Sequence, residues 1–167
     1  MTMTPIAETD DLEWCARLMA ASEPWITLRR DYAACLAALS NPVKERYLVR
    51  DGNQRVGLLI LDMTGPLPGY IQSICLAPGT RGQGLGHQVM AWAEARILRD
   101  STNVFICVSS FNPDARRLYE RLGYQLVGQL DRYVVDDHHE LLLRKSFGSW
   151  DAFRRNAATA ASPEREG

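Results

Sequence analysis

The 167-residue sequence lacks any apolar run long enough to span a lipid bilayer. Its apolar runs, such as residues 57–61, are far shorter than the about 20 residues that a membrane-spanning helix needs. The first residues also lack a basic segment followed by an apolar one, which is the pattern of a secretory signal. We therefore expect a cytoplasmic protein without a membrane partner.

The sequence has no excess of either charge, since 19 Lys and Arg face 20 Asp and Glu for a formal net charge of −1. This balance gives no reason to expect nucleic acid as a partner. It also lacks a C-x-x-C pair or a His at ligand spacing from a Cys. We expect no bound metal and four reduced, mostly buried thiols. These are Cys15, Cys35, Cys75 and Cys107.

Hydrophobic periodicity predicts a single domain over residues 1–146, with an extension over 147–167 that is partly disordered. The predicted helices cover residues 10–20, 31–39, 85–99 and 112–122. The predicted strands cover residues 47–50, 55–63, 70–76, 103–109, 124–130 and 140–144. Asp10 and Glu13 have the spacing of a capping box at the start of the first helix. This order of elements predicts an α/β fold with a mixed sheet, not an all-parallel one.

A glycine-rich turn separates the predicted strand 70–76 from the long helix that follows it. Its residues are Arg81, Gly82, Gln83, Gly84, Leu85 and Gly86. Glycines let a backbone approach a ligand closely, and a helix N-terminus offers free N–H groups to an anion. The turn fits neither a Walker A loop, because Leu85 and Gly86 stand in place of Lys and Ser or Thr, nor the G-x-G-x-x-G dinucleotide fingerprint.

A second motif follows the predicted strand 103–109. Its residues are Asn112, Ala115, Leu118, Tyr119, Gly123 and Tyr124. Asn112 suits an N-cap, Pro113 the first helical position and Gly123 the position after the helix. With the glycine turn, which has the pattern [QR]-x-x-G-x-[GA], this motif makes residues 5–145 resemble the GNAT superfamily of acetyltransferases.

This resemblance implies a mixed sheet of about seven strands, flanked by about four helices. Strands 70–76 and 103–109 would run parallel and splay apart, and acetyl-CoA would bind between them as cosubstrate. By analogy, its pantetheine arm would pair with the backbone of Ile74, Cys75 and Leu76. Its pyrophosphate would meet the amides of the glycine turn, which are those of Arg81, Gly82, Gln83, Gly84, Leu85 and Gly86.

The resemblance also assigns roles to single residues. Tyr119 would be the general acid that protonates the departing CoA thiolate, and Asn112 would hydrogen-bond the pantetheine amide. The general base is not identified, because Gln72, Ser73 and Cys107 fill the positions where relatives carry a carboxylate. A water relay, a group near the acceptor such as Glu140 or His138, and weak activity all stay open. Cys107 has no neighbouring His that would make it a nucleophile.

Specificity would lie in two variable segments, one between the first two helices and one before the last strand. Trp25 and Tyr133 could form an aromatic wall for a cationic amine. Two residue pairs in these segments make opposite predictions about the charge of the acceptor. Asp136 and Asp137 would attract a cation, whereas Arg29 and Arg30 would favour a carboxylate.

We predict an N-acetyltransferase that moves the acetyl group to a primary amine by direct attack in a ternary complex. The acceptor would be a small molecule or a peptide, and its identity, like the preferred acyl group, stays open. The alternative is a non-catalytic acyl-CoA-binding regulatory or sensor protein of the same fold. A homodimer also stays open.

Overall fold

The computed structural model describes residues 1–80 and 82–160. Its helices are α1 (Thr9–Ala20), α2 (Tyr32–Leu39), α3 (Leu85–Ile97), α4 (Pro113–Arg121) and α5 (Trp150–Ala160), with a 3-10 turn at Pro78–Thr80. Its strands are β1 (Thr2–Pro5), β2 (Glu45–Asp51), β3 (Gln54–Asp62), β4 (Tyr70–Leu76), β5 (Asn103–Ser109), β6 (Gln125–Asp131) and β7 (His139–Ser146). Within the described part of the chain, no helix is long and apolar enough to cross a membrane.

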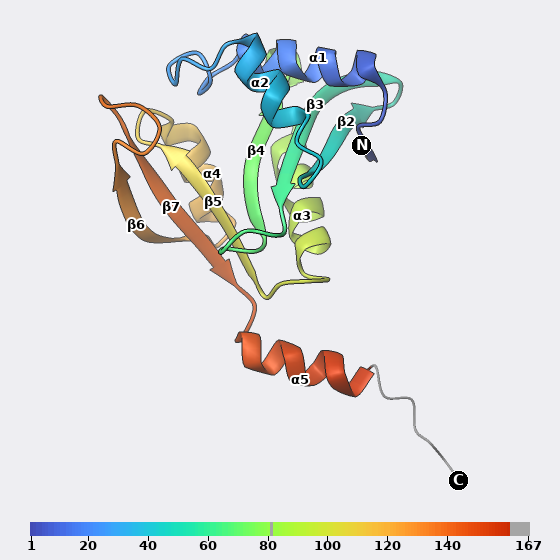
Figure 1. Cartoon of the computed structure of the whole chain (residues 1–167), viewed down its shortest axis with the longest axis vertical. Helices are drawn as coiled ribbons and strands as arrows, with labels where there is room; N and C mark the ends of the chain where they lie inside the picture. The colour runs from blue at the N-terminus through green and yellow to red at the C-terminus, as the bar shows by residue number, and fades with distance from the viewer. Residues whose placement is uncertain (81, 161–167) are drawn as a thin grey trace.

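The seven strands form one mixed sheet in the order β1-β2-β3-β4-β5-β7-β6, as predicted for the fold class. Every neighbouring pair is antiparallel except β4 and β5, which run parallel. These two pair only at their beginnings, where Tyr70 lies opposite Phe105 and Ile71 opposite Ile106. Beyond this point they separate, and the opening is visible between them in Figure 1. The predicted splay is confirmed.

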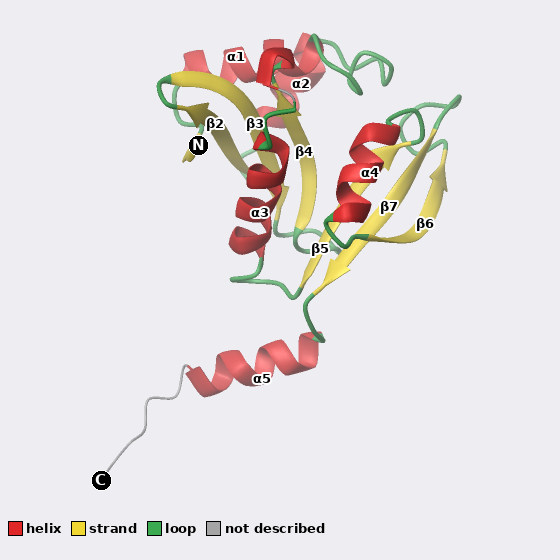
Figure 2. Cartoon of the chain, turned by 180° about the vertical axis from the view of Figure 1, so that it is seen from behind, coloured by secondary structure: helices red, strands yellow, loops and turns green. Residues whose placement is uncertain are grey.

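Helices cover both faces of the sheet. Helices α3 and α4 lie on one face, on either side of the opening (Figure 2), and α1 and α2 pack together on the other face over β2–β4. The side chains of β3 alternate between the two cores: Leu59 and Leu61 face α3, whereas Leu58 and Ile60 face α1 and α2. This alternation explains why residues 56–61 read as one continuous apolar run.

A β-bulge interrupts β4 where the sheet opens. Leu61 pairs with Ile71 and Ile60 pairs with Ser73, so Gln72 is the extra residue that has no partner on β3. A bulge changes the direction in which the following side chains point. Ile71 accordingly packs in the core under α3, whereas Cys75, four residues later, packs in the core under α1 and α2.

Three local features differ from the sequence predictions. The capping box at Asp10 and Glu13 was wrong, because α1 begins at Thr9 after Glu8, with no side-chain cap. Asp10 instead pairs with Arg55 of β3. Strand β1 was missed because it has only four residues, of which two are threonines and one is Pro5. Helix α5 was also missed; it lies in the predicted extension and projects away from the sheet (Figure 1).

Candidate functional site

The glycine turn leads directly into α3. Gly82 and Gly84 have φ angles of 77° and 75°, which L-residues rarely adopt, and Gly84 is the N-cap of the helix. A Cβ atom built on either glycine would meet no atom within 4 Å, so this side of the turn faces open space. Among the predicted site residues here, Arg81 lies outside the described part of the chain.

The following two residues of the turn serve to attach α3 to the domain. Leu85 is buried in the core under α3. A Cβ atom on Gly86 would lie 3.4 Å from Leu118 Cδ2 of α4 and 3.8 Å from Leu76 Cδ1 of β4. Gly86 therefore allows the start of α3 to sit close to the elements on both sides of the opening.

Among the described residues, β4 pairs with β5 only at Tyr70 and Ile71. Ile74, Cys75 and Leu76 pair through their backbones with β3, at Leu59, Leu58 and Gly57. Their pairing with β5 has already ended, because the register with that strand stops at Ile71. The opening that begins beyond Ile71 therefore has room for an extended ligand to lie alongside β4.

Helix α4 begins and ends as the sequence predicts. The Asn112 side chain accepts a hydrogen bond from Ala115 N at 3.2 Å through Oδ1, which leaves its amide NH₂ to serve another partner. At the other end, Gly123 N donates to Glu120 O and Tyr124 N donates to Tyr119 O, each at 3.0 Å. This is a Schellman motif, with Gly123 at a φ of 91°.

The same motif positions Tyr119. Its ring packs against that of Tyr124, with 6.0 Å between the centroids, and Tyr119 is only 6% exposed. Burial raises the pKa of the Tyr119 hydroxyl, so the group stays protonated at neutral and mildly alkaline pH.

A cavity of about 210 Å³ lies between the splayed strands and α4. Tyr119 and Asn112 line it from α4, Gln72 and Ser73 from the β4 bulge, and Glu140 from β7. The two α4 motif residues and the bulge, which are far apart in the sequence, thus meet at one point where β4 and β5 separate.

Glu140 is the buried carboxylate of this cavity, with 6% of its surface exposed. It lies opposite Ser109 of β5, and the Ser109 hydroxyl donates a hydrogen bond to Glu140 Oε1 at 2.6 Å. Burial raises the pKa of Glu140, against this hydrogen bond and the fields of His139 and His138, which lower it. His138 itself packs against the Phe111 ring, with 4.7 Å between the centroids.

Cys107 also lines the cavity, from β5. The pKa of its thiol is raised, mainly by burial and in part by the field of Glu140. A hydrogen bond with Tyr70 opposes this rise. A thiol in these surroundings stays protonated and is a poor nucleophile at neutral pH.

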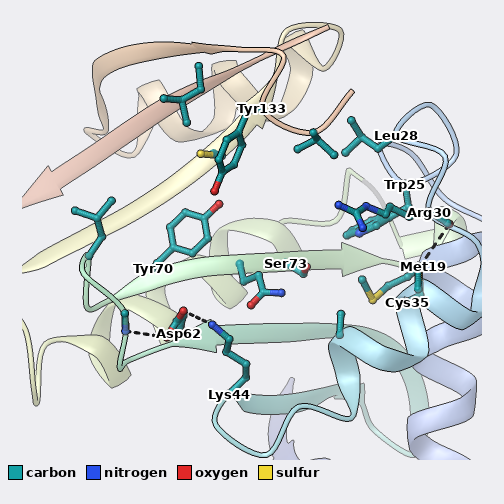
Figure 3. Close-up of a pocket in the computed structure, with 18 of the residues that line it drawn as sticks. Met19, Trp25, Leu28, Arg30, Cys35, Lys44, Asp62, Tyr70, Ser73 and Tyr133 are labelled. Carbon is teal, nitrogen blue, oxygen red and sulfur yellow. Dashed lines mark hydrogen bonds and ion pairs between the residues drawn. The ribbon is translucent and has the colours of Figure 1, made fainter. Parts of the chain in front are cut away.

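A second cavity of about 500 Å³ continues from the first on the face of the sheet that carries α1 and α2. Trp25, Tyr70 and Tyr133 line both cavities. In Figure 3, Tyr70 of β4 and Tyr133 of the β6–β7 loop point toward one another, and the Arg30 guanidinium points into the cavity beside Trp25. The predicted aromatic residues Trp25 and Tyr133 therefore line the same two cavities.

Two charged residues that line this second cavity form an ion pair with each other. Lys44 Nζ pairs with Asp62 Oδ2, and both side chains are mostly buried. The other carboxylate oxygen, Oδ1, accepts hydrogen bonds from Thr64 and from Gly65 N. Asp62 is thus fully engaged in holding the turn after β3.

Comparison with known proteins identifies this architecture. Residues 6–124 match the family model described as acetyltransferase (GNAT) family. The chain belongs to this family. An acetyltransferase of Agrobacterium fabrum (strain C58) is 34% identical over 61 residues. The match covers 36% of this chain and 44% of that protein, so the chain spans less than half the length of this relative.

Solved GNAT-type structures share the fold. A structure assigned to the GNAT family, from Desulfovibrio desulfuricans, covers 88% of this chain and 99% of its own with a TM-score of 0.72 and 15% identity. An aminoglycoside 6′-N-acetyltransferase complexed with coenzyme A covers 89% of this chain and 98% of its own (TM-score 0.70, 13% identity). The Vibrio cholerae spermidine N-acetyltransferase, in complex with CoA and spermine, covers 87% and 95% (TM-score 0.67, 18% identity).

Sequence reasoning missed part of this GNAT site. Tyr70, Lys44 and Asp62 gave no signal, because each lies at the end of a strand or in a loop without a motif. Glu140 was only one of several options for a base. Its burial depends on its position opposite Ser109, which no local pattern reveals.

Proposed function

We propose that this protein is an N-acetyltransferase that transfers the acetyl group of acetyl-CoA to a primary amine. The observation that supports it most is the convergence of three features on one opening in the sheet: the glycine turn at the start of α3, the edge of β4 beside the opening, and the cavity lined by Tyr119 and Glu140. Family membership supports the same activity.

The residues around the opening fit acetyl-CoA. The open space beside Gly82 and Gly84, next to the N-terminus of α3, suits a pyrophosphate, because the first N–H groups of a helix have no partner within it. The edge of β4 beside the opening and the Asn112 amide suit the amides of the pantetheine arm. When bound, acetyl-CoA supplies an activated acetyl group in the form of a thioester.

Tyr119 would act as the general acid. Its hydroxyl lines the cavity at which the strands separate, and burial keeps the proton on it. A protonated phenol at this position can donate its proton to the sulfur that leaves when the carbon–sulfur bond breaks.

Glu140 would act as the general base, a role that sequence analysis left open. An amine is mostly protonated at neutral pH and must lose a proton before its lone pair can attack a carbonyl carbon. The Glu140 carboxylate faces the same cavity as Tyr119, and its raised pKa brings its basicity closer to neutral pH. Glu140 would take the proton from the ammonium, and the new carbon–nitrogen bond would then form directly.

The state of the cysteines also supports direct transfer. Cys107 is the only cysteine that lines both described cavities, and its raised pKa disfavours an acetyl-thioester on the protein. Incubation with acetyl-CoA alone is expected to leave Cys75 and Cys107 unmodified by mass spectrometry. An acetyl adduct that forms at the rate of turnover and passes to the acceptor would contradict this.

Two measurements test the proposal. Calorimetry with acetyl-CoA is expected to show binding, and an acceptor panel followed by free-thiol release is expected to show turnover. Binding of acetyl-CoA without release of thiol for any amine would support the alternative, a regulatory or sensor protein. Absence of binding would contradict both.

A further inference from the structure

In the sequence, the charged residues of the proposed acceptor end favoured acceptors of opposite charge. Their pairing in the structure shows which of these charges remain for a ligand. Arg29 Nη2 lies 3.1 Å from Asp137 Oδ2, so these two opposed charges neutralise each other outside the cavities. Asp136 is exposed and does not line either cavity. Arg30, by contrast, lines the larger cavity.

The segment that carries Arg30 is ordered by its own hydrogen bonds. Arg30 N donates to Trp25 O at 2.9 Å, and Cys35 Sγ donates to Arg30 O at 3.7 Å. Arg29 has a φ angle of 55°, a conformation that costs a non-glycine residue free energy. This turn sends two consecutive arginines in different directions, Arg29 toward Asp137 and Arg30 into the cavity (Figure 3).

Arg30 is the one cation of the larger cavity whose charge is not matched by a partner among the described residues. Lys44 is neutralised by Asp62. The nearest acidic residue along the chain, Asp31, uses its carboxylate to cap α2 through Ala34 N at 2.9 Å. The guanidinium therefore offers several N–H donors to a ligand, in the planar arrangement that suits a carboxylate.

The smaller cavity has the opposite charge. It contains the buried Glu140 and, at its rim, Glu23, whose carboxylate accepts hydrogen bonds from Thr27 N and Oγ1. The combined site is therefore anionic where the reaction would occur and cationic at its far end. Apolar and aromatic side chains connect the two ends, namely Trp25, Leu28, Tyr70, Tyr133 and Val134.

From this separation of charge we infer that the acceptor is a small amino acid whose amine and carboxylate lie at opposite ends of an apolar chain, with its ammonium at Glu140 and its carboxylate at Arg30. An apolar body would fit the walls between them, and a cavity of about 500 Å³ is of the size that binds small molecules. A polyamine is disfavoured, because it would place a second cation beside Arg30. The inference rests on the proposed function, whose acceptor it specifies.

The test compares acceptors that differ only in the carboxylate. The panel contains γ-aminobutyrate with butylamine, 5-aminovalerate with pentylamine, and spermidine. The kcat/KM is expected to be about 10- to 100-fold higher for the acid in at least one of these sets, which is the range of a hydrogen bond to a charged group. Spermidine preferred over both acids, or no preference for an acid in either set, would overturn the inference.

Variants at two neighbouring arginines locate the effect. Arg30→Gln is expected to reduce the preference for the acid to about one, and Arg30→Glu to reverse it in favour of the amine. The matched control, Arg29→Gln, removes the same charge one residue away and is expected to retain the preference. An unchanged preference in Arg30→Gln would overturn the assignment of Arg30.

Binding separates failure of this inference from failure of the proposed function. If no amine is acetylated, the proposed transfer is contradicted, and calorimetry with CoA and each acid still decides the inference. Binding of an acid that Arg30→Gln abolishes and Arg29→Gln retains would support an amino-acid site. No binding of either acid by the CoA complex would overturn it.

Discussion

The two ends of the cleft are built from different parts of the chain. The proposed cofactor end consists mainly of backbone: a glycine turn, the start of α3 and the edge of β4 beside the opening. The proposed acceptor end consists of side chains from several loops, strands and helices, with aromatic walls and one cation that has no partner among the described residues. A backbone site suits a ligand common to a whole family, whereas a side-chain site can change its ligand without a change of fold.

The largest expected effect is on kcat and concerns Tyr119, which lies where the two ends of the cleft meet. Tyr119→Phe keeps the ring that packs on Tyr124 and removes only the hydroxyl. Because general acid–base catalysis contributes ~100- to 10,000-fold, kcat is expected to fall by a factor in this range while the Kd for acetyl-CoA changes little. Unchanged kcat, with chemistry shown to be rate-limiting, would remove Tyr119 from the mechanism. A large rise in Kd would instead assign the hydroxyl to cofactor binding.

Glu140→Gln tests the proposed general base, which would take a proton from the acceptor amine. Gln retains an amide oxygen that can accept from Ser109, but it cannot take a proton from an ammonium. We expect kcat/KM at neutral pH to fall by about 100-fold, and the deficit to shrink as pH rises and more of the amine is already deprotonated. The measurement is a pH profile of both proteins.

The control for Glu140 is Glu120→Gln, which removes an exposed carboxylate that pairs with Arg116 on α4. Its profile is expected to match the parent. If Glu140→Gln also keeps the shape and height of the parent profile, another group or a water chain removes the proton.

A smaller effect separates ligand binding from backbone strain at the cofactor end. Ala at Gly84 or at Gly52 would occupy a positive φ with no atom within 4 Å of its Cβ. Each substitution is therefore expected to cost about 1–2 kcal/mol of stability. Only Gly84→Ala is expected to weaken acetyl-CoA binding, by roughly 10-fold, since the added methyl fills ligand space. Denaturant unfolding and calorimetry measure the two effects; equal affinities would place the pyrophosphate elsewhere.

The backbone features of the site could be predicted from the sequence, whereas the side-chain contacts at the acceptor end could not. Gly84 and Gly123 adopt positive φ angles that few residues tolerate, and Asn112 caps α4 through its side chain, so their spacing predicted the turn and both ends of α4. The pairing of Arg29 with Asp137 joins residues that are 108 positions apart. No local pattern encodes such a contact, so the sequence left the charge preference of the acceptor end undecided.

The burial of Glu140 leads to the smallest expected effect. Its pKa in the folded protein is raised by burial, against the hydrogen bond from Ser109 and the fields of His139 and His138. Protonation therefore favours the folded state; this contribution is present below the unfolded pKa and is lost as pH rises through the folded pKa.

Replacing Glu140 with Gln removes this pH dependence. The Tm of Glu140→Gln is expected to match the parent near pH 4 and to exceed it at pH 8 by about 2–4 °C, the shift that about 1 kcal/mol makes in a chain of this size. Thermal unfolding across this pH range measures it. A difference that shrinks toward pH 8 would mean that Glu140 is stabilised as the anion.

The ion pair between Arg29 and Asp137 joins the two loops that border the acceptor cavity, and both side chains are more than half exposed. Exposed pairs of this kind contribute about 0–1 kcal/mol. Exposed side chains change rotamer within picoseconds to nanoseconds, whereas enzymes typically turn over ~1 to 1,000 times per second. We therefore expect the pair to break and re-form many times within one turnover, and its opening to cost an acceptor that arrives by diffusion no more than about 1 kcal/mol.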